Sequence, residues 1–280
     1  MRTRAEADEL PIADGGEGTL EALHAALGGE WRTAVVPDAY GRLRKARWLW
    51  HDGDAFVEAA EAIPLDPERL DPLEASSRGL GELIMAVGNP AILFVALGGT
   101  ANVDGGWGMR DVVQRLPAPT VVLCDVDVPL VDAARVFAAQ KGATPDVARV
   151  LEQRLLALDD LRPVADVPGA GAAGGLGAAL AALGARLERG ADMVLTLSGF
   201  SPLRYHLVVT GEGTVDSTTM QGKAPGEVIR RCQAERKRCV LFGGRVVEAP
   251  VDVETIALSG DPARAREDLV ELGARLAGTV

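Results

Sequence analysis

Two lysines in this sequence occupy positions where they could bind phosphate. Of the 29 basic residues only four are lysines. Lys141 lies in the segment QKGAT and Lys223 in QGKAP, each beside glycine and just before a proline that starts a predicted helix. A compact ammonium there adds charge to backbone amides that already favour anions. A solvent-exposed turn lysine is the alternative for either residue alone, whereas the two together favour phosphate chemistry.

Carboxylates in other glycine-rich segments could supply the second half of a phosphoryl-transfer site. Mg²⁺ takes oxygen ligands and needs only one or two protein carboxylates beside the substrate phosphates. For each residue taken singly, the alternative is a solvated surface acid. The candidates are Asp14 and Glu17 in ADGGEGT, Asp104 in ANVDGG, Asp125 and Asp127 in CDVD, and Glu212 and Asp216 in GEGTVD.

Two better-known nucleotide motifs fit poorly. Gly169, Gly171 and Gly174 match the GxGxxG pattern of dinucleotide folds, but VADVP before them is a poor strand. The acid expected about twenty residues later at a strand end is also missing, because Asp192 precedes its expected strand. The Walker A pattern fails because Ala224, rather than Ser or Thr, follows the lysine of QGKAP. A nicotinamide enzyme is therefore the weaker hypothesis, and ATP would need another kind of fold.

The elements that must position these residues alternate between strands and helices, which indicates a parallel α/β architecture. Ligands bind such sheets beyond the carboxyl ends of the strands. Glycine gathers where the expected strands end, although tight turns without a ligand are the alternative. The expected strands are 91–97, 120–124, 207–210, 239–242 and 255–258, and the expected helices are 19–27, 77–87, 146–158, 176–187, 225–236 and 263–276.

Composition excludes several classes of protein. A net charge of −11 argues against nucleic acid as a main partner, because phosphate backbones are bound through clustered Lys and Arg. The three cysteines form no CxxC pair, which supports neither a zinc site nor a disulfide framework and fits a cytoplasmic protein. The long uncharged stretch 168–185 is mostly Ala and Gly, so we expect no membrane span.

Seven segments, in order along the chain, resemble the bacterial glycerate kinases. The resemblance implies an α/β fold with a parallel-sheet, Rossmann- or flavodoxin-like lobe, a second α/β lobe and an active-site cleft between them. It places residues 1–30 and 192–280 in the first lobe and 31–191 in the second. The segments are PIADGGEGT (11–19), DPLEASSRGLGELI (71–84), ALGGTANVDGGWGM (96–109), CDVDVPL (124–130), VFAAQKGATP (136–145), PGAGAAGGLGAAL (168–180) and TGEGTVDSTTMQGKAPGEV (210–228).

The resemblance implies transfer of the γ-phosphoryl group of ATP, with Mg²⁺, to D-glycerate, giving 2-phosphoglycerate. Small molecules would be the partners, and a homodimer is kept open. The expected catalytic residues are Asp104, Asp125, Lys141, Glu212 and Lys223, with Asp125 and Glu212 also as Mg²⁺ ligands. The expected substrate- or phosphate-binding residues are Asp14, Gly15, Gly16, Glu17, Gly98, Gly99, Asn102, Gly211, Gly213 and Asp216.

The sequence also departs from the family pattern. Asn102 and Val103 stand where the family usually has Thr-Asn, which removes a polar group beside Asp104. The family's opening strand and its lysine-bearing loop are absent, so we expect the 280 residues to be a shortened form of a longer protein. The alternative function is a catalytically impaired protein that keeps the kinase fold and binds nucleotide or a small hydroxy acid without turnover.

Overall fold

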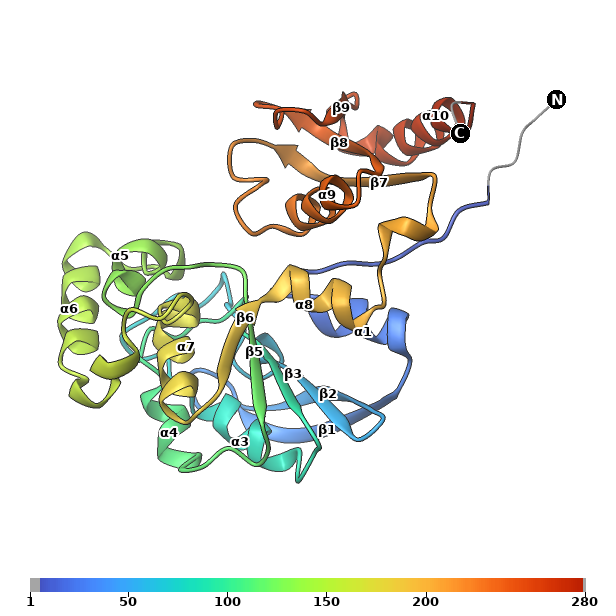
Figure 1. The fold of residues 1–280 in the computed structure, drawn as a ribbon. Coiled ribbons are helices and arrows are strands. Elements are labelled where there is room, and N and C mark those ends of the chain that lie inside the picture. Colours follow the sequence, from blue (N-terminus) through green and yellow to red (C-terminus); the bar gives the residue numbers. More distant parts are fainter. Residues whose placement is uncertain (1–5, 279–280) are drawn as a thin grey trace. The chain divides into compact units, whose positions relative to one another are not determined.

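The computed structural model describes residues 6–278 and divides into two compact units. The larger unit is Pro11–Val194, and the smaller unit combines the described residues up to Leu10 with those from Leu195 onward. Each unit has its own sheet (Figure 1). The expected α/β class and the second α/β lobe are therefore confirmed.

The larger unit is built on a six-stranded sheet whose order follows the chain. The β1–β2 and β2–β3 pairs are antiparallel, and every pair from β3 to β6 is parallel. All residues of β4 and β5 are buried, as expected for parallel strands covered on both faces. The strands are β1 (Glu30–Pro37), β2 (Leu43–His51), β3 (Asp54–Glu58), β4 (Leu93–Ala96), β5 (Thr120–Cys124) and β6 (Arg186–Arg189).

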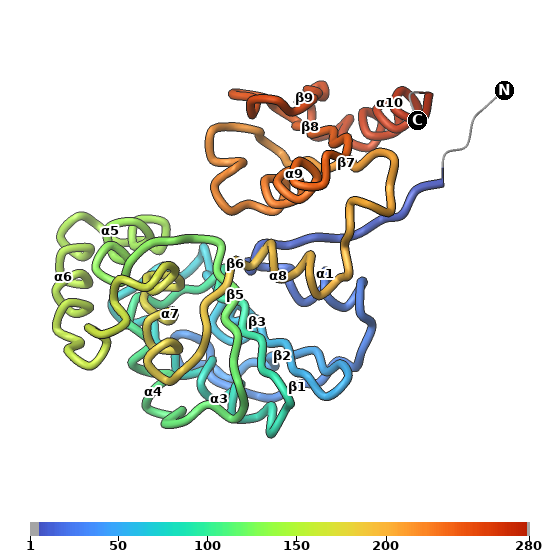
Figure 2. Tube along the Cα trace, in the orientation of Figure 1, coloured from blue at the N-terminus to red at the C-terminus, as the bar shows by residue number. Residues whose placement is uncertain are grey.

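Helices of the larger unit enclose two apolar cores. One core joins the sheet to α3, α4 and α7, and the other lies among α5, α6 and α7 (Figure 2). None of the helices in residues 6–278 is long and apolar enough to cross a membrane. The helices are α1 (Thr19–Leu27), α2 (Ala59–Ala62), α3 (Arg78–Ala86), α4 (Trp107–Val112), α5 (Ala133–Phe137), α6 (Pro145–Leu156), α7 (Ala172–Ala182) and α8 (Gly190–Leu197), the last of which runs into the smaller unit.

The smaller unit is a three-stranded parallel sheet with a helix on each face. Neighbouring residues of β8 point to opposite faces: Leu241 packs with Ile229 of α9, and Val240 packs with Leu272 of α10. Its elements are β7 (Leu207–Val215), α9 (Ala224–Ala234), β8 (Arg238–Val246), β9 (Glu254–Ala257) and α10 (Ala265–Ala277).

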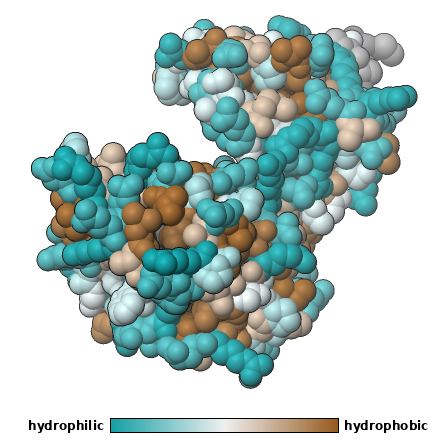
Figure 3. All heavy atoms as spheres, turned by 60° about the vertical axis from the view of Figure 1, so that its left-hand side comes forward, coloured by the Kyte–Doolittle hydropathy of each residue, from teal (hydrophilic) through white to brown (hydrophobic). Residues whose placement is uncertain are grey.

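Hydrophilic side chains cover most of the face drawn in Figure 3, in line with the 25% of charged residues.

All the expected strands form, and so do most of the expected helices, but two expectations were wrong. Residues after Asp192 form helix α8 rather than a strand, because a short apolar run fits a buried helix equally well. The segment from Gly211 on is not a loop, since β7 continues to Val215. A Cβ on Gly211 would lie 2.5 Å from the carbonyl oxygen of Phe242, so glycine is needed there for strand packing.

Helix α1 belongs to the larger unit in this structure, where it packs on β2 and β3. The family resemblance instead predicts that residues 1–30 share a lobe with residues 192–280. The lobe boundaries after residues 30 and 191, and the cleft expected between the lobes, stay predictions.

A distant carboxylate caps α1 and holds the ADGGEGT segment on the sheet. The N-cap residue, Gly18, has φ 89° and no side chain to cap the helix. Glu58, at the end of β3 and only 4% exposed, accepts hydrogen bonds from the backbone N–H groups of Gly18 and Leu20, both at 3.2 Å. Burial raises the pKa of the Glu58 carboxyl, and these two hydrogen bonds oppose that shift. Glu58 thus replaces the missing N-cap side chain.

Replacing this cap should destabilise the protein. We expect Glu58→Ala to lower the free energy of unfolding by about 1–2 kcal/mol, the usual cost of losing a cap. Urea unfolding followed by circular dichroism measures it. Glu30→Ala, which breaks only the exposed Glu30–Arg32 ion pair, is the matched control and should change stability by less than about 1 kcal/mol. Equal effects of the two substitutions would contradict the capping role.

Candidate functional site

Five of the resembling segments meet at the carboxyl ends of β4 and β5 in the larger unit. They surround a cavity of about 120 Å³ whose lining includes Gly98, Gly99, Asp125 and Lys141, here called the Lys141 cavity. Parallel strands end at one edge of the sheet, so side chains following β4 and β5 lie close together there. This edge is the candidate active site.

Backbone packing between two glycine segments forms the floor of this edge. Gly98 donates its N–H to the carbonyl oxygen of Gly15 at 2.9 Å. A Cβ on Gly98 would lie 2.3 Å from the Cα of Gly16, so only glycine permits the approach. The exposed Glu17 lies beside the same loop, with its Oε2 3.8 Å from where a Cβ on Gly99 would stand.

Asp14 lies close enough to Asp125 to influence the charge of the Asp125 carboxyl. Asp125 is exposed, but partial desolvation by the surrounding loops raises the pKa of its carboxyl, and the negative charge of Asp14 raises it further. Asp14 accepts a hydrogen bond from the Gly16 N–H at 3.2 Å through Oδ1. Two neighbouring carboxylates at a strand end suit either a divalent cation or a proton acceptor. The described residues hold no group of three or more His, Cys, Asp or Glu side chains that could bind a metal by themselves.

Lys141 is a buried ammonium with one protein partner. It ends a short 3₁₀ turn (Ala139–Lys141), is 3% exposed, and donates from Nζ to the carbonyl oxygen of Asn102 at 2.7 Å. Burial lowers its pKa to about 7, and the charge of Asp104 only partly opposes that shift. An ammonium has three donors, so within residues 6–278 the remaining N–H groups are available to a ligand in the cavity.

The Asp104 carboxylate organises the loop beside Lys141. It accepts five hydrogen bonds: Oδ2 from the N–H and Oγ of Ser77 and the N–H of Gly108, and Oδ1 from Nδ2 of Asn102 and the N–H of Gly106. These bonds occupy both oxygens, which favours a positioning role over a free base. Val103 does not weaken the loop, because it lies in an apolar core with Leu130 and Leu151.

A second lysine–carboxylate cluster lies in the smaller unit. Lys223, at the N-cap of α9, is 3.3 Å from Oε2 of Glu212 and 3.9 Å from Oδ1 of Asp216. The buried Thr219 donates from Oγ1 to Oε1 of Glu212 at 2.5 Å and accepts the N–H of Asp216 at 3.0 Å. Hydrogen bonds from the hydroxyl and N–H of Thr218 lower the pKa of the Asp216 carboxyl, and Lys223 adds to that shift.

The structure thus sorts the expected site residues into two groups. Gly211 and Gly213 lie in β7 beside Glu212, with the smaller cluster. Sequence reasoning missed the partners Ser77 and Thr219, although both stand in segments that carry the family resemblance. The group in the larger unit contains Asp14, Gly15, Gly16, Glu17, Gly98, Gly99, Asn102, Asp104, Asp125 and Lys141.

Comparison with known proteins gives a consistent result. The model of the glycerate kinase family matches residues 1–116 and 111–260. A glycerate 2-kinase of Escherichia coli K12 is 35% identical over 85% of this chain and 76% of its own length, and a glycerate kinase of Bacillus subtilis 168 is 36% identical over 79% and 71%. A crystal structure described as a glycerate kinase 2 from Salmonella typhimurium LT2 is 31% identical, with a TM-score of 0.79 over 96% of this chain and 87% of that one.

The lowered pKa of Lys141 predicts a pH-dependent stability. Between about pH 7 and the ordinary lysine value of 10.5, the unfolded chain binds a proton that the folded chain lacks, so the free energy of unfolding should rise with pH. The slope approaches about 1.4 kcal/mol per pH unit for one proton. Lys141→Met should lose this rise, whereas Lys45→Met, at an exposed site, should keep it. Urea unfolding at pH 7, 8 and 9 measures the slopes, and parallel slopes for the wild type and Lys141→Met would refute the prediction.

Proposed function

The chain belongs to the glycerate kinase family, and on that premise we propose that it phosphorylates D-glycerate with ATP to give 2-phosphoglycerate. The observation that carries the proposal is the Lys141 cavity. It combines a buried ammonium, glycine amides and a carboxylate of raised pKa at the carboxyl ends of parallel strands. Anion neutralisation and a proton acceptor are what phosphoryl transfer requires of a protein.

In the proposed reaction, the 2-hydroxyl oxygen of glycerate forms a bond to the γ-phosphorus of ATP. The bond from that phosphorus to the β–γ bridging oxygen breaks, and ADP leaves with the electron pair. Asp125 accepts the hydroxyl proton, because its raised pKa makes it a better acceptor than an ordinary aspartate. Lys141 binds an anionic oxygen of the substrates through N–H groups that Asn102 does not use.

Asp14 is the residue that would hold Mg²⁺ beside Asp125. Its Oδ1 accepts the Gly16 N–H, and Oδ2 has no partner within residues 6–278, so one carboxylate oxygen is available. Bound there, Mg²⁺ would neutralise charge on the phosphates. Glu212, the other expected ligand, is already paired with Lys223 and Thr219, which makes it the weaker candidate.

Lys223 is proposed to bind phosphate from the smaller unit. It stands at the N-terminus of the 11-residue helix α9, where backbone N–H groups and the helix dipole favour an anion. Its side chain is 38% exposed, so it can reach a ligand, while Glu212 and Asp216 hold it in place. A cytoplasmic location is part of the proposal and rests on the sequence pattern of the cysteines.

The first test is turnover. We expect ADP formation that depends on D-glycerate, followed with a coupled enzyme assay. Lys223→Ala and Lys141→Met should each lower kcat/KM by on the order of 10² or more, since each removes a positive charge proposed to bind phosphate. Lys45→Ala is the control and should match the wild type. Ligand-induced thermal stabilisation without turnover would favour the impaired-kinase alternative over an active enzyme.

The second test concerns Mg²⁺. Removal of divalent cations with EDTA should abolish ADP formation, and added Mg²⁺ should restore it. Asp14→Asn should raise the Mg²⁺ concentration needed for half-maximal activity by about tenfold, because it removes charge from a cation ligand. Asp66→Asn, in a loop of the same unit, is the control. An unchanged Mg²⁺ requirement in Asp14→Asn would show that the cation is held elsewhere.

A further inference from the structure

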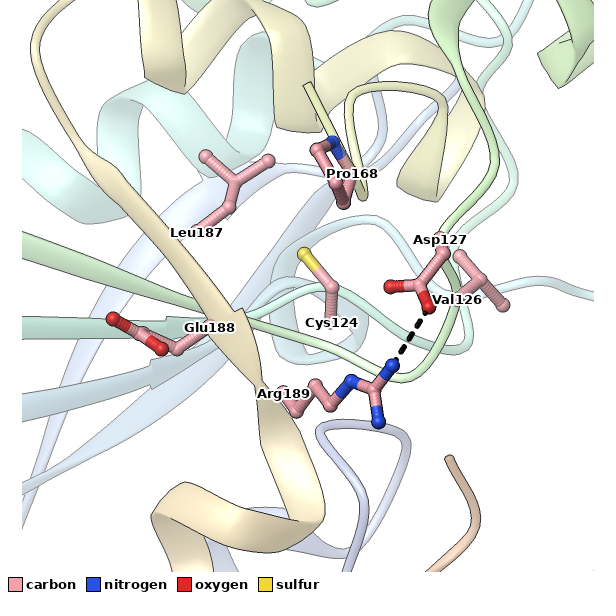
Figure 4. Close-up of a pocket in the computed structure, with 7 residues that line it drawn as sticks. All are labelled: Cys124, Val126, Asp127, Pro168, Leu187, Glu188 and Arg189. Atoms are coloured by element: carbon pink, nitrogen blue, oxygen red, sulfur yellow. Dashed lines mark hydrogen bonds and ion pairs between the residues drawn. The ribbon is translucent and has the colours of Figure 1, made fainter. Parts of the chain in front are cut away.

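A larger pocket lies next to the Lys141 cavity, at the carboxyl ends of β5 and β6. It measures about 400 Å³ and is lined by seven residues, which Figure 4 shows as sticks. We call it the β5–β6 pocket. Val126 lines both this pocket and the Lys141 cavity, so the two hollows are neighbours within one unit. A ligand that occupies both would extend along the edge of the sheet.

The two hollows differ in the size of ligand that they can hold. At about 120 Å³ the Lys141 cavity suits a small acid or a phosphate group rather than a whole nucleotide. At about 400 Å³ the β5–β6 pocket falls within the range of about 300–1,000 Å³ typical of sites for cofactors and drug-sized ligands. ATP is the larger of the two proposed substrates, and its nucleoside part therefore fits the β5–β6 pocket by size.

One side of the β5–β6 pocket is apolar. Pro168, from the loop before α7, and Leu187, from β6, lie on this side, and the thiol of Cys124 at the end of β5 points between them (Figure 4). Burial raises the pKa of the Cys124 thiol to about 12, so it stays neutral. Apolar side chains of this kind can pack against an aromatic base.

The other side of the pocket carries charge. Nη2 of Arg189 lies 3.1 Å from Oδ2 of Asp127, the ion pair marked in Figure 4, whereas the carboxylate of Glu188, which also lines the pocket, points away from this pair. Carboxylates at strand ends bind ribose hydroxyls, and arginine binds phosphate oxygens. The Arg189 side chain is 55% exposed, and its Nε and Nη1 have no partner within residues 6–278, so these donors can bind a ligand.

We propose that the β5–β6 pocket binds the adenosine half of ATP, with the phosphates directed toward the Lys141 cavity. This inference rests on the proposed function. The apolar side would contact the adenine ring, the carboxylate of Asp127 would accept hydrogen bonds from the ribose hydroxyls, and Arg189 would contact the first phosphates. A purely anionic ligand fits less well, because two carboxylates line the same pocket.

The test separates the KM for ATP from the KM for D-glycerate. Leu187→Trp, which fills the apolar side, and Arg189→Glu, which reverses the exposed charge, should each raise the KM for ATP about tenfold or more. The KM for D-glycerate should stay within about twofold of the wild type. Arg32→Glu is the matched control, because Arg32 also forms an exposed ion pair on this sheet, and it should change neither constant. Arg189→Lys should restore part of the ATP affinity.

The outcomes distinguish the pocket from the proposed function. If both variants unfold cooperatively like the wild type and keep its KM for ATP, or raise the KM for D-glycerate instead, the pocket assignment is wrong although the kinase is active. If the wild type shows no turnover, the proposed function fails, and ADP alone tests the pocket. ADP should then raise the Tm of the wild type but not of Arg189→Glu. An equal shift in both, or no shift in the wild type, would overturn the assignment.

Discussion

The burial of one ammonium group constrains the architecture of the candidate site. Lys141 loses most of its hydration and gains one short hydrogen bond, which its Nζ donates to the carbonyl oxygen of Asn102, and the nearby charge of Asp104. Desolvation outweighs the charge of Asp104, which is why the pKa of Lys141 falls to about 7. Such a group is costly for folding unless an anion joins it. Because the carbonyl oxygen of Asn102 is the hydrogen-bond acceptor of Lys141, the loop that carries Asn102 and Asp104 must hold that oxygen in place. Five hydrogen bonds to Asp104 fix this loop.

The same edge of the sheet depends on close contacts that only glycine allows. Gly98 rests against Gly16, and Gly15 has φ 97° with the carbonyl oxygen of Leu123 only 2.9 Å from where its Cβ would stand. These close backbone contacts place Asp14 beside Asp125 and bring the ADGGEGT segment to the ends of β4 and β5. Glu58 fixes the far side of that loop by capping α1. Side chains of ordinary size would push the carboxylates apart.

Local sequence patterns predicted much of the secondary structure of the larger unit, and the family resemblance named most residues of its candidate site, whose roles stay predictions. Leu93–Ala96 and Thr120–Cys124 are short, fully buried runs, so periodicity and composition identify them as parallel strands. The hairpin β1–β2 was missed, because basic residues interrupt the apolar pattern of β2, whose Ala46 and Trp48 nevertheless face the core. The basic side chains stack across the hairpin, Arg47 on Trp31 and Arg32 on Trp50. Ser77 and Glu58 could not be assigned from the sequence, since their partners lie more than 25 residues away in the chain: Ser77 donates to the carboxylate of Asp104, and Glu58 accepts from the backbone N–H of Leu20. Only the fold reveals such partners.

The two lysines singled out by their rarity belong to different kinds of site. Lys141 is enclosed and poorly neutralised, whereas Lys223 is partly exposed and faces two carboxylates. An ion pair as exposed as that of Lys223 contributes at most about 1 kcal/mol to stability, so stability does not explain the surrounding order. That order is considerable, because the fully buried Thr219 uses its hydroxyl to orient Glu212 and to hold the Asp216 backbone. These contacts orient Glu212 and Asp216, and through them Lys223, while adding little stability. Such fixed orientation is what a side chain needs when it must contact a ligand in one geometry.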